Sequence, residues 1–308
     1  TPARVERAAP SMGEGNDELL SRILGMTPDE IQRLTDEGAL SPKTPLPESV
    51  YESSNPLERP YWAWALPMLR LSNEGDDIDG TESTTIISEE AQNQVATSST
   101  GHETSALNGL RVLDMSNELG GYGVKLLADL GADVVRVEPP EGSEMRGVAP
   151  FWKGARLYQL YFDSGKRSVT LRLDTSEGKE IFRQLVKDAD VLYEGHRPGY
   201  LAFHGFDWGQ LHALNPRLVE VSVTPFGQTG PYRDWKAEDL TLWALSGMVQ
   251  LTGYPDRRPL IIGAELSHYY IGSIGTIGTI AALHARERTG LGQHVDISGH
   301  DVLVSVAG

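Results

Sequence analysis

The sequence predicts an α/β fold in which helices cover both faces of a mostly parallel sheet. Short apolar segments alternate with amphipathic helical segments along residues 107–308. Strands separated by helices form βαβ units, and right-handed crossovers place those helices on both faces. Hydrophobic residues make up 39% of the 308 residues, which is enough for a packed core.

The elements of this body follow from hydrophobic periodicity. Strands are predicted at Leu110–Met115, Asp133–Val137, Ser168–Leu173, Val191–Tyr193, Leu218–Val223 and His294–Ile297. Helices are predicted at Tyr122–Leu130, Ser176–Ala189 with Ser176 as N-cap, Glu238–Leu251 and about Leu266–Arg288. The glycines at positions 272, 275 and 278 of the last helix indicate close helix packing.

Residues 1–40 are predicted to contain two short helices. Leu19, Leu20 and the apolar pair at 23 and 24 form a helical stripe that ends at Gly25, a residue typical of a C-cap. The next helix begins with Thr27 as N-cap and Pro28 at its first position. Two helices of this length bury little surface alone, so they must pack on another surface.

Residues 41–106 are predicted to be an acidic, largely disordered linker. Between Ser41 and Asn108 there are eleven acidic residues against three basic ones, and serine, threonine and proline are frequent. Such a segment cannot bury enough apolar surface to fold. The chain therefore divides into 1–40, 41–106 and the folded body 107–308.

Charge and composition exclude several classes of function. The net charge of −16 repels phosphate backbones, so we expect no nucleic-acid partner. Without cysteine, the chain has no disulfide and no thiolate ligand, and Gly199 and Gly205 keep His196, His204 and His212 off a common helix, so no metal is expected. No apolar run is long enough to span a membrane, and no leader follows Thr1. These features favour a cytoplasmic globular protein, cut from a longer chain.

A glycine-rich turn follows the first predicted strand. The segment Glu118–Gly123 precedes a helix, and the second strand ends at Glu138, where a Rossmann-like site would bind ribose. The glycines at 120, 121 and 123 do not form G-x-G-x-x-G. A nicotinamide site and a simple tight turn both remain open, and the turn is favoured.

Six motifs in order give a more specific signal. They are Val137-Glu-Pro-Pro-Glu-Gly142, Tyr161-Phe-Asp-Ser-Gly-Lys-Arg-Ser-Val-Thr-Leu171, Glu194-Gly-His-Arg-Pro-Gly199, Asn215-Pro-Arg-Leu218, Phe226-Gly-Gln-Thr-Gly-Pro-Tyr232 and Arg286-Glu-Arg-Thr-Gly-Leu-Gly-Gln-His-Val-Asp296. In this order they resemble the class III CoA-transferase family, the CaiB/BaiF-like proteins. The resemblance covers Leu107 to the C-terminus and implies the large Rossmann-like domain of that fold, incomplete at its C-terminal side.

Residues 13–40 resemble the C-terminal tail of the same family. A family C-terminus that precedes a family N-terminus implies the junction of a tandem protein. Residues 1–40 would then be the helical tail of a preceding copy, and 107–308 the large domain of a second copy. Family members resemble interlocked dimers, so the other copy would be an interlocked partner, with further homo-oligomers possible.

The resemblance also implies chemistry. Such enzymes move coenzyme A from an acyl-CoA to a free carboxylic acid, and an aspartate that attacks the thioester passes through an anhydride to an aspartyl-CoA thioester. CoA is a substrate, and no permanently bound cofactor is implied. The implied CoA-binding positions are Glu138, Pro139, Arg146, Gly195, His196 and Arg197, with Lys166 and Arg167 as weaker phosphate-binding candidates.

The catalytic positions depart from the family pattern. Counting back from Ala281 places His268 where transferases have their aspartate, and Glu238, before Asp239, stands where related racemases have a histidine. Gly195 and His196 replace a usual Asn and Phe, and Phe203 lies near a usual Arg or Lys.

Three hypotheses follow from these departures. The catalytic aspartate lies in the other copy, or this copy is a non-catalytic scaffold, or Glu238 and His268, beside Asp239, form an exchanged acid/base pair acting on an acyl-CoA. The first two are compatible for the whole protein.

Overall fold

A computed structural model describes residues 10, 12–43, 105–147, 151–152 and 155–307. Within them lies a six-stranded sheet in the order β5-β2-β1-β6-β7-β8, and every pairing in it is parallel. Most of the predicted linker, residues 44–104, lies outside the described residues. No helix in the described part of the chain combines the length and apolar character needed to cross a bilayer.

The six strands fall close to the predicted segments. They are β1 (Arg111–Met115), β2 (Asp133–Glu138), β5 (Arg167–Thr170), β6 (Val191–Glu194), β7 (Val219–Thr224) and β8 (His294–Ser298). Their order is that of a doubly wound sheet, whose direction of winding reverses between β1 and β6. A separate antiparallel pair is formed by β3 (Phe151–Trp152) and β4 (Ala155–Arg156).

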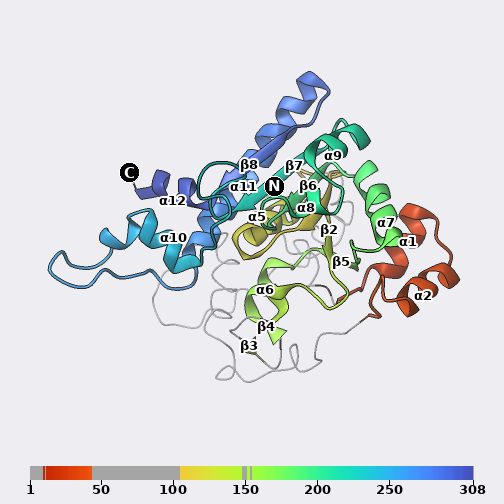
Figure 1. Cartoon of the computed structure of the whole chain (residues 1–308), viewed down its shortest axis with the longest axis horizontal. Coiled ribbons are helices and arrows are strands. Elements are labelled where there is room, and N and C mark those ends of the chain that lie inside the picture. The colour runs from red at the N-terminus through yellow and green to blue at the C-terminus, as the bar shows by residue number, and fades with distance from the viewer. Residues whose placement is uncertain (1–9, 11, 44–104, 148–150, 153–154, 308) are drawn as a thin grey trace, which may run out of the picture.

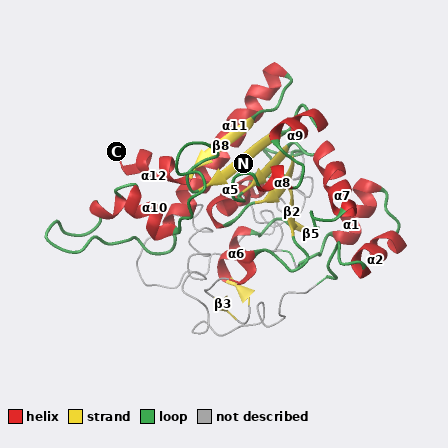
Figure 2. Cartoon of the chain, viewed as in Figure 1, coloured by secondary structure: helices red, strands yellow, loops and turns green. Residues whose placement is uncertain are grey.

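Helices flank the sheet on both sides, as predicted (Figure 2). They are α5 (Glu118–Asp129), α6 (Leu157–Phe162), α7 (Ser176–Lys187), α8 (Tyr200–Phe203), α9 (Trp208–Leu214), α10 (Asp239–Leu245), α11 (Leu266–Thr289) and α12 (Gly299–Ala307), with short 3-10 turns η6 (Glu144–Gly147) and η7 (Met248–Gln250). One core cluster includes apolar residues of β1, β6, β7, α5 and α11, and the other joins β2, β5 and α7.

The start of α5 corrects the predicted glycine turn. The helix begins at Glu118 rather than Tyr122, with Asn117 as N-cap, so the glycines at 120, 121 and 123 are helical. A Cβ on Gly272 of α11 would lie 2.6 Å from the Gly123 amide nitrogen, so the two helices touch through their backbones. This contact confirms the helix packing predicted for Gly272, whereas Gly275 and Gly278 approach side chains of β6 and β8. It also explains why a helix-breaking residue lies inside α5.

Three other boundaries differ from prediction. The segment predicted as Glu238–Leu251 is the helix α10 and the turn η7, separated by Gly247 with φ of 82°. The third strand ends at Thr170 instead of Leu173, because Arg172 turns to bond the Ala39 carbonyl. Thr175, not Ser176, is the N-cap of α7, since its hydroxyl accepts the Gly178 amide proton.

The two N-terminal helices are α1 (Asn16–Leu24) and α2 (Pro28–Asp36), which are red in Figure 1. They lie beside β5 and α7. Gly25 is left-handed and Thr27 caps α2, as predicted, with Glu30 completing a capping box. Leu19, Leu20 and their apolar neighbours join the core cluster of β5 and α7. The helices thus bury the apolar stripe that they could not bury alone.

Asn16 ties this segment to the edge strand. Its Oδ1 accepts the Thr170 amide proton at 2.9 Å, and its Nδ2 donates to the Ser41 carbonyl at 2.8 Å and to Thr170 Oγ1 at 3.0 Å. An edge strand presents unpaired backbone groups that invite unwanted pairing. Residues 12–41 occupy this edge, as the bond from the Gly15 amide to the Ser168 carbonyl also indicates.

We expect Asn16→Ala to lower the free energy of unfolding by about 1–3 kcal/mol, because buried partners lose their hydrogen bonds. Urea denaturation measures this change. Ser21→Ala, on the exposed side of α1, is the matched control and is expected to have little effect. Equal effects of the two substitutions would contradict the role given to Asn16.

Candidate functional site

The candidate site is a cavity of about 170 Å³ at the carboxyl ends of β1, β2 and β5. Ligands of doubly wound sheets bind at this edge, near the point where the winding reverses. Three of the predicted CoA-binding residues line the cavity: Glu138, Pro139 and His196. Tyr200 and His204 form another part of the lining.

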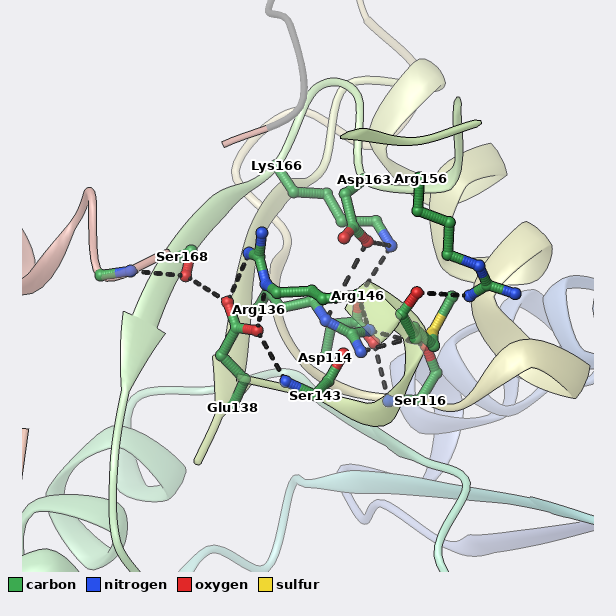
Figure 3. A network of polar contacts seen from close by, with 12 residues as sticks. Asp114, Ser116, Arg136, Glu138, Ser143, Arg146, Arg156, Asp163, Lys166 and Ser168 are labelled. Atoms are coloured by element: carbon green, nitrogen blue, oxygen red, sulfur yellow. Dashed lines mark hydrogen bonds and ion pairs between the residues drawn. The ribbon is translucent and has the colours of Figure 1, made fainter. Parts of the chain in front are cut away.

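Glu138 and Arg146 form a bidentate ion pair at the end of β2. Arg146 Nε and Nη2 each lie 2.7 Å from a Glu138 carboxylate oxygen, and Ser168 Oγ donates to the same carboxylate at 2.7 Å (Figure 3). Burial opposes ionisation of Glu138, but the hydrogen bonds and the charge of Arg146 outweigh burial and lower the pKa of Glu138. The charges of these two predicted CoA-binding residues are therefore paired with each other.

Aromatic rings form another part of the lining of this cavity. The His196 ring stacks on Tyr200 with centroids 4.0 Å apart, and Tyr200 packs on His204 at 4.7 Å. His204 Nδ1 is fixed by the Leu173 carbonyl at 3.1 Å. A stacked imidazole and phenol offer a flat surface of the kind that binds an aromatic base.

A buried ion network lies behind the cavity. Lys166 Nζ is 2.7 Å from Asp114 Oδ2 and 3.3 Å from Asp163 Oδ1, and Arg136 Nη1 is 3.2 Å from Asp114 Oδ2 (Figure 3). Burial opposes ionisation of Asp114, but Lys166 and Arg136 hold its pKa well below its usual range. Lys166 is fully buried in this network, which gives it a structural role.

Arg167 and Arg197 occupy two further positions. Arg167 pairs with Asp133 and with Glu18 of α1, so its charge supports the β5 edge. Arg197 is exposed and lines a second cavity rather than this one. Neither guanidinium contributes to the lining of the first cavity.

Gly195 meets Asn117 at the reversal point between β1 and β6. Asn117 Nδ2 donates to the Gly195 carbonyl at 2.6 Å while its Oδ1 caps α5. A Cβ at Gly195 would lie 2.6 Å from the backbone nitrogen of Asn117. The glycine that departs from the family pattern is therefore required here by Asn117.

His268 is buried at the start of α11, near two carboxylates. Its Nδ1 lies 3.5 Å from Glu265 Oε2, and ligand atoms of Glu118, Glu265 and His268 all lie within 4.8 Å of one another. His268 lowers the pKa of Glu265, with a smaller contribution from Arg156. Arg156 is also ion-paired with Glu118. This guanidinium disfavours a metal cation, and the imidazole lies close to the carboxylates of Glu118 and Glu265.

The other two predicted catalytic residues are placed differently. Glu238 is exposed at the N-cap of α10. Asp239 accepts hydrogen bonds from Ser267 and, at 2.9 Å, from Trp243 Nε1, so it joins α10 to the start of α11. Asp239 therefore touches the neighbour of His268, while the carboxylates gathered around the imidazole come from Glu265 and Glu118.

Sequence analysis missed Glu118, Arg156 and Asn117. Glu118 and Arg156 are 38 residues apart, and Asn117 and Gly195 are 78 apart. A usable signal existed at Asn117, because an asparagine after a strand and before a helix is a typical N-cap. Ala264 and Glu265, both left-handed with φ of 66° and 51°, had no such signal.

A doubly wound sheet with a cavity at its carboxyl edge defines the class of α/β domains that bind ligands at that edge. A family model described as CoA-transferase family III matches residues 107–308, and the chain belongs to this family. A crystal structure of a CaiB/BaiF family protein from Brucella suis is 38% identical, with a TM-score of 0.63, covering 66% of this chain and 56% of the other.

Two curated relatives carry transferase names. The chain is 41% identical over 193 residues to succinyl-CoA:(R)-benzylsuccinate CoA-transferase subunit BbsE of Thauera aromatica, covering 61% of this chain and 47% of that protein. It is 40% identical over 197 residues to acetyl-CoA:oxalate CoA-transferase of Acetobacter aceti, covering 63% and 51%. The chain spans about half the length of these relatives.

We expect Gly195→Ala to destabilise the protein by about 1–3 kcal/mol, because the added methyl group collides with the Asn117 backbone. Thermal and urea unfolding measure the effect. The control is Gly147→Ala, at an exposed glycine where a Cβ meets nothing within 4 Å among the described residues. Unchanged stability of Gly195→Ala would contradict the close approach.

Lys166→Met is expected to lower the free energy of unfolding by about 3–5 kcal/mol, since two buried carboxylates would be left to share Arg136. The matched control is Lys187→Met, an exposed lysine of α7. Denaturant unfolding compares the two variants. A loss no larger than that of the control would show that the network is not stabilising.

Proposed function

We propose that the whole protein is a class III CoA-transferase that moves coenzyme A between an acyl-CoA and a carboxylic acid, and that this copy of the fold is its non-catalytic half. Family membership and the transferase names of the relatives support the reaction. CoA is the substrate of this reaction, and the cavity of Glu138, Pro139 and His196 lies where the family resemblance implies its binding site.

The residue at the head of α11 carries the proposal for this copy. The family route requires a carboxylate that attacks the thioester and then holds CoA as a thioester. By the count from Ala281, His268 stands at the position of that carboxylate, and the structure buries it close to Glu265. A neutral imidazole can be acylated, but it cannot form the anhydride on which the route depends.

The charges around the cavity also favour a non-catalytic half. Glu138, Glu141 and Asp174 line it, whereas Arg172 is the one arginine or lysine among its described lining. Arg172 Nη2 is already 3.0 Å from Glu141 Oε2. Glu138 is likewise paired with Arg146, so the phosphates of CoA would meet the Asp174 carboxylate without an unpaired arginine or lysine in the described lining, which weakens binding.

A second copy of the fold in the longer protein would supply the catalytic aspartate. Residues 12–41 would be the tail of that copy, and their docking on β5 is consistent with interlocked copies. The relative from Thauera aromatica is named as a subunit, so division of a transferase into more than one part has a parallel.

The alternative is an acid/base pair of Glu238 and His268 acting next to a thioester. Glu238 is exposed, and the carboxylates gathered at the imidazole are Glu118 and Glu265. This arrangement supports the acid/base pair less than it supports a non-catalytic copy. Substitution of His268 distinguishes the two hypotheses.

His268→Ala in the full-length protein is expected to leave CoA transfer within a few-fold of wild type. Transfer from succinyl-CoA or acetyl-CoA to a panel of carboxylic acids is measured by chromatography of the CoA products. His284→Ala, an exposed histidine of the same helix, is the matched control. A loss of about 10²–10⁴-fold in a folded variant would instead identify His268 as an acid/base catalyst.

A further inference from the structure

A second cavity of about 170 Å³ lies beside the first, and Tyr200 lines both. Its lining includes Glu194 of β6, Glu220 and Ser222 of β7, and His294 of β8. Side chains of α8 and α9 complete it, among them Trp208. Arg197 is the one residue of this described lining for which the family resemblance implies a role in CoA binding.

The register of the sheet explains why polar groups gather here. Glu194 lies opposite Ser222, and Glu220 lies opposite both Leu192 and His294. Alternate residues of a strand point to one face. The intervening Tyr193 and Val221 belong to the apolar cluster that includes α5 and α11, so the polar residues point to the other face. Inner strands of parallel sheets are ordinarily apolar on both faces.

Glu220 is the anomaly in this group. Only 4% of it is exposed, and its Oε2 has no hydrogen-bond partner among the described residues. Burial, with Glu194 and Asp207, raises the pKa of Glu220 to about 8. Glu194 is equally buried and accepts the His196 amide proton at 2.7 Å. An unpartnered buried carboxyl group calls for an explanation.

The remaining groups that face Glu220 do not neutralise it. His294 Nε2 is 2.9 Å from Ser222 Oγ, and burial lowers the pKa of His294, so its ring is neutral at pH 7. Asp207, at the rim, is acidic. Arg197 is the one basic side chain of the described lining that carries a fixed charge, and it is exposed. The His196 ring, which is partly exposed, lies 3.7 Å from Glu194. The cavity therefore holds two buried carboxyl groups without a fully buried cation in its described lining.

A metal ion does not fit this arrangement. Among the described residues, the one group of three ligands within 4.8 Å is that of Glu118, Glu265 and His268, so Glu194, Glu220 and His294 lie farther apart. A metal ion holds its ligands at about 2.0–2.6 Å and needs them close together. A larger cation with several N–H donors can bridge separated carboxylates.

We propose that this cavity binds a guanidinium group through Glu220 and Glu194. A guanidinium is planar, has several N–H donors and can bond two carboxylates at once. The Ser222 hydroxyl offers a further acceptor, and the Trp208 ring, which also packs on His212 and His294, lines the same cavity. The ligand is a small alkylguanidine or an arginine side chain of another polypeptide segment. This site is independent of the transfer chemistry proposed above.

Binding and proton release are coupled. A bound cation favours the ionised form of Glu220, so binding at pH 7 releases a proton. The affinity for the cation therefore rises with pH until Glu220 is already ionised in the free protein, above about pH 8. Protonation of His294 at lower pH adds a competing positive charge and acts in the same direction. These signs distinguish the site from a surface carboxylate.

The test is calorimetric titration of the full-length protein with methylguanidinium at pH 6, 7 and 8, in buffers that differ in ionisation enthalpy. Saturable binding, proton release at pH 7 and tighter binding at higher pH are expected. Tetramethylammonium, which lacks N–H donors, is expected not to bind. N-acetylarginine amide is titrated as the second ligand. Tighter binding of methylguanidinium identifies a free alkylguanidine as the natural ligand, and tighter binding of N-acetylarginine amide identifies an arginine side chain.

Glu220→Gln should weaken binding at least tenfold and remove the proton release. The amide has the shape of the neutral carboxyl group, so the fold is retained, which circular dichroism checks. Glu177→Gln, an exposed glutamate of α7, is the matched control and should bind like wild type. Absence of saturable binding, or equal binding by Glu220→Gln, would overturn the proposal.

Discussion

The carboxylate of Asp114 holds together the edge of the sheet on which the candidate site is built. It lies at the end of the central strand β1 and accepts from Lys166, Arg136 and the Ser116 amide. Lys166 immediately precedes β5, and Arg136 belongs to β2, so one buried anion fixes three neighbouring elements. Because its pKa is depressed, its contribution to stability is complete at neutral pH and is lost only in strong acid.

The same chain of polar contacts extends outward to the N-terminal segment. Glu138 accepts from Ser168, and Ser168 Oγ accepts the Gly13 amide proton at 3.2 Å. The segment that covers the β5 edge is thus connected to a residue that lines the first cavity. Loss of residues 12–41 would expose that edge and also release one restraint on Glu138.

Much of the fold could be predicted, because strands and caps depend on neighbouring residues. The apolar runs located the six strands, and Thr27 and Gly25 located helix ends. The start of α5 was missed because Gly123 meets Gly272, a contact between distant helices that overrides the low helix propensity of glycine. The same holds for the site: Glu138, Pro139 and His196 could be found from local motifs, whereas Glu118 and Asn117 depend on partners that are distant in the sequence.

Glu138 and Glu220 are two buried glutamates of the same sheet, and they differ in whether a cation pairs with them. Glu138 and Glu220 are both almost inaccessible to water, but Arg146 lowers the pKa of the first, while that of the second is raised for want of a cation. A purely structural position on an inner strand would be served better by an apolar residue, since burying an unpaired carboxyl group costs about 1–3 kcal/mol or more. The arginine that Glu138 has within the chain is what Glu220 lacks, so a guanidinium supplied from elsewhere would complete the second cavity on the pattern of the first.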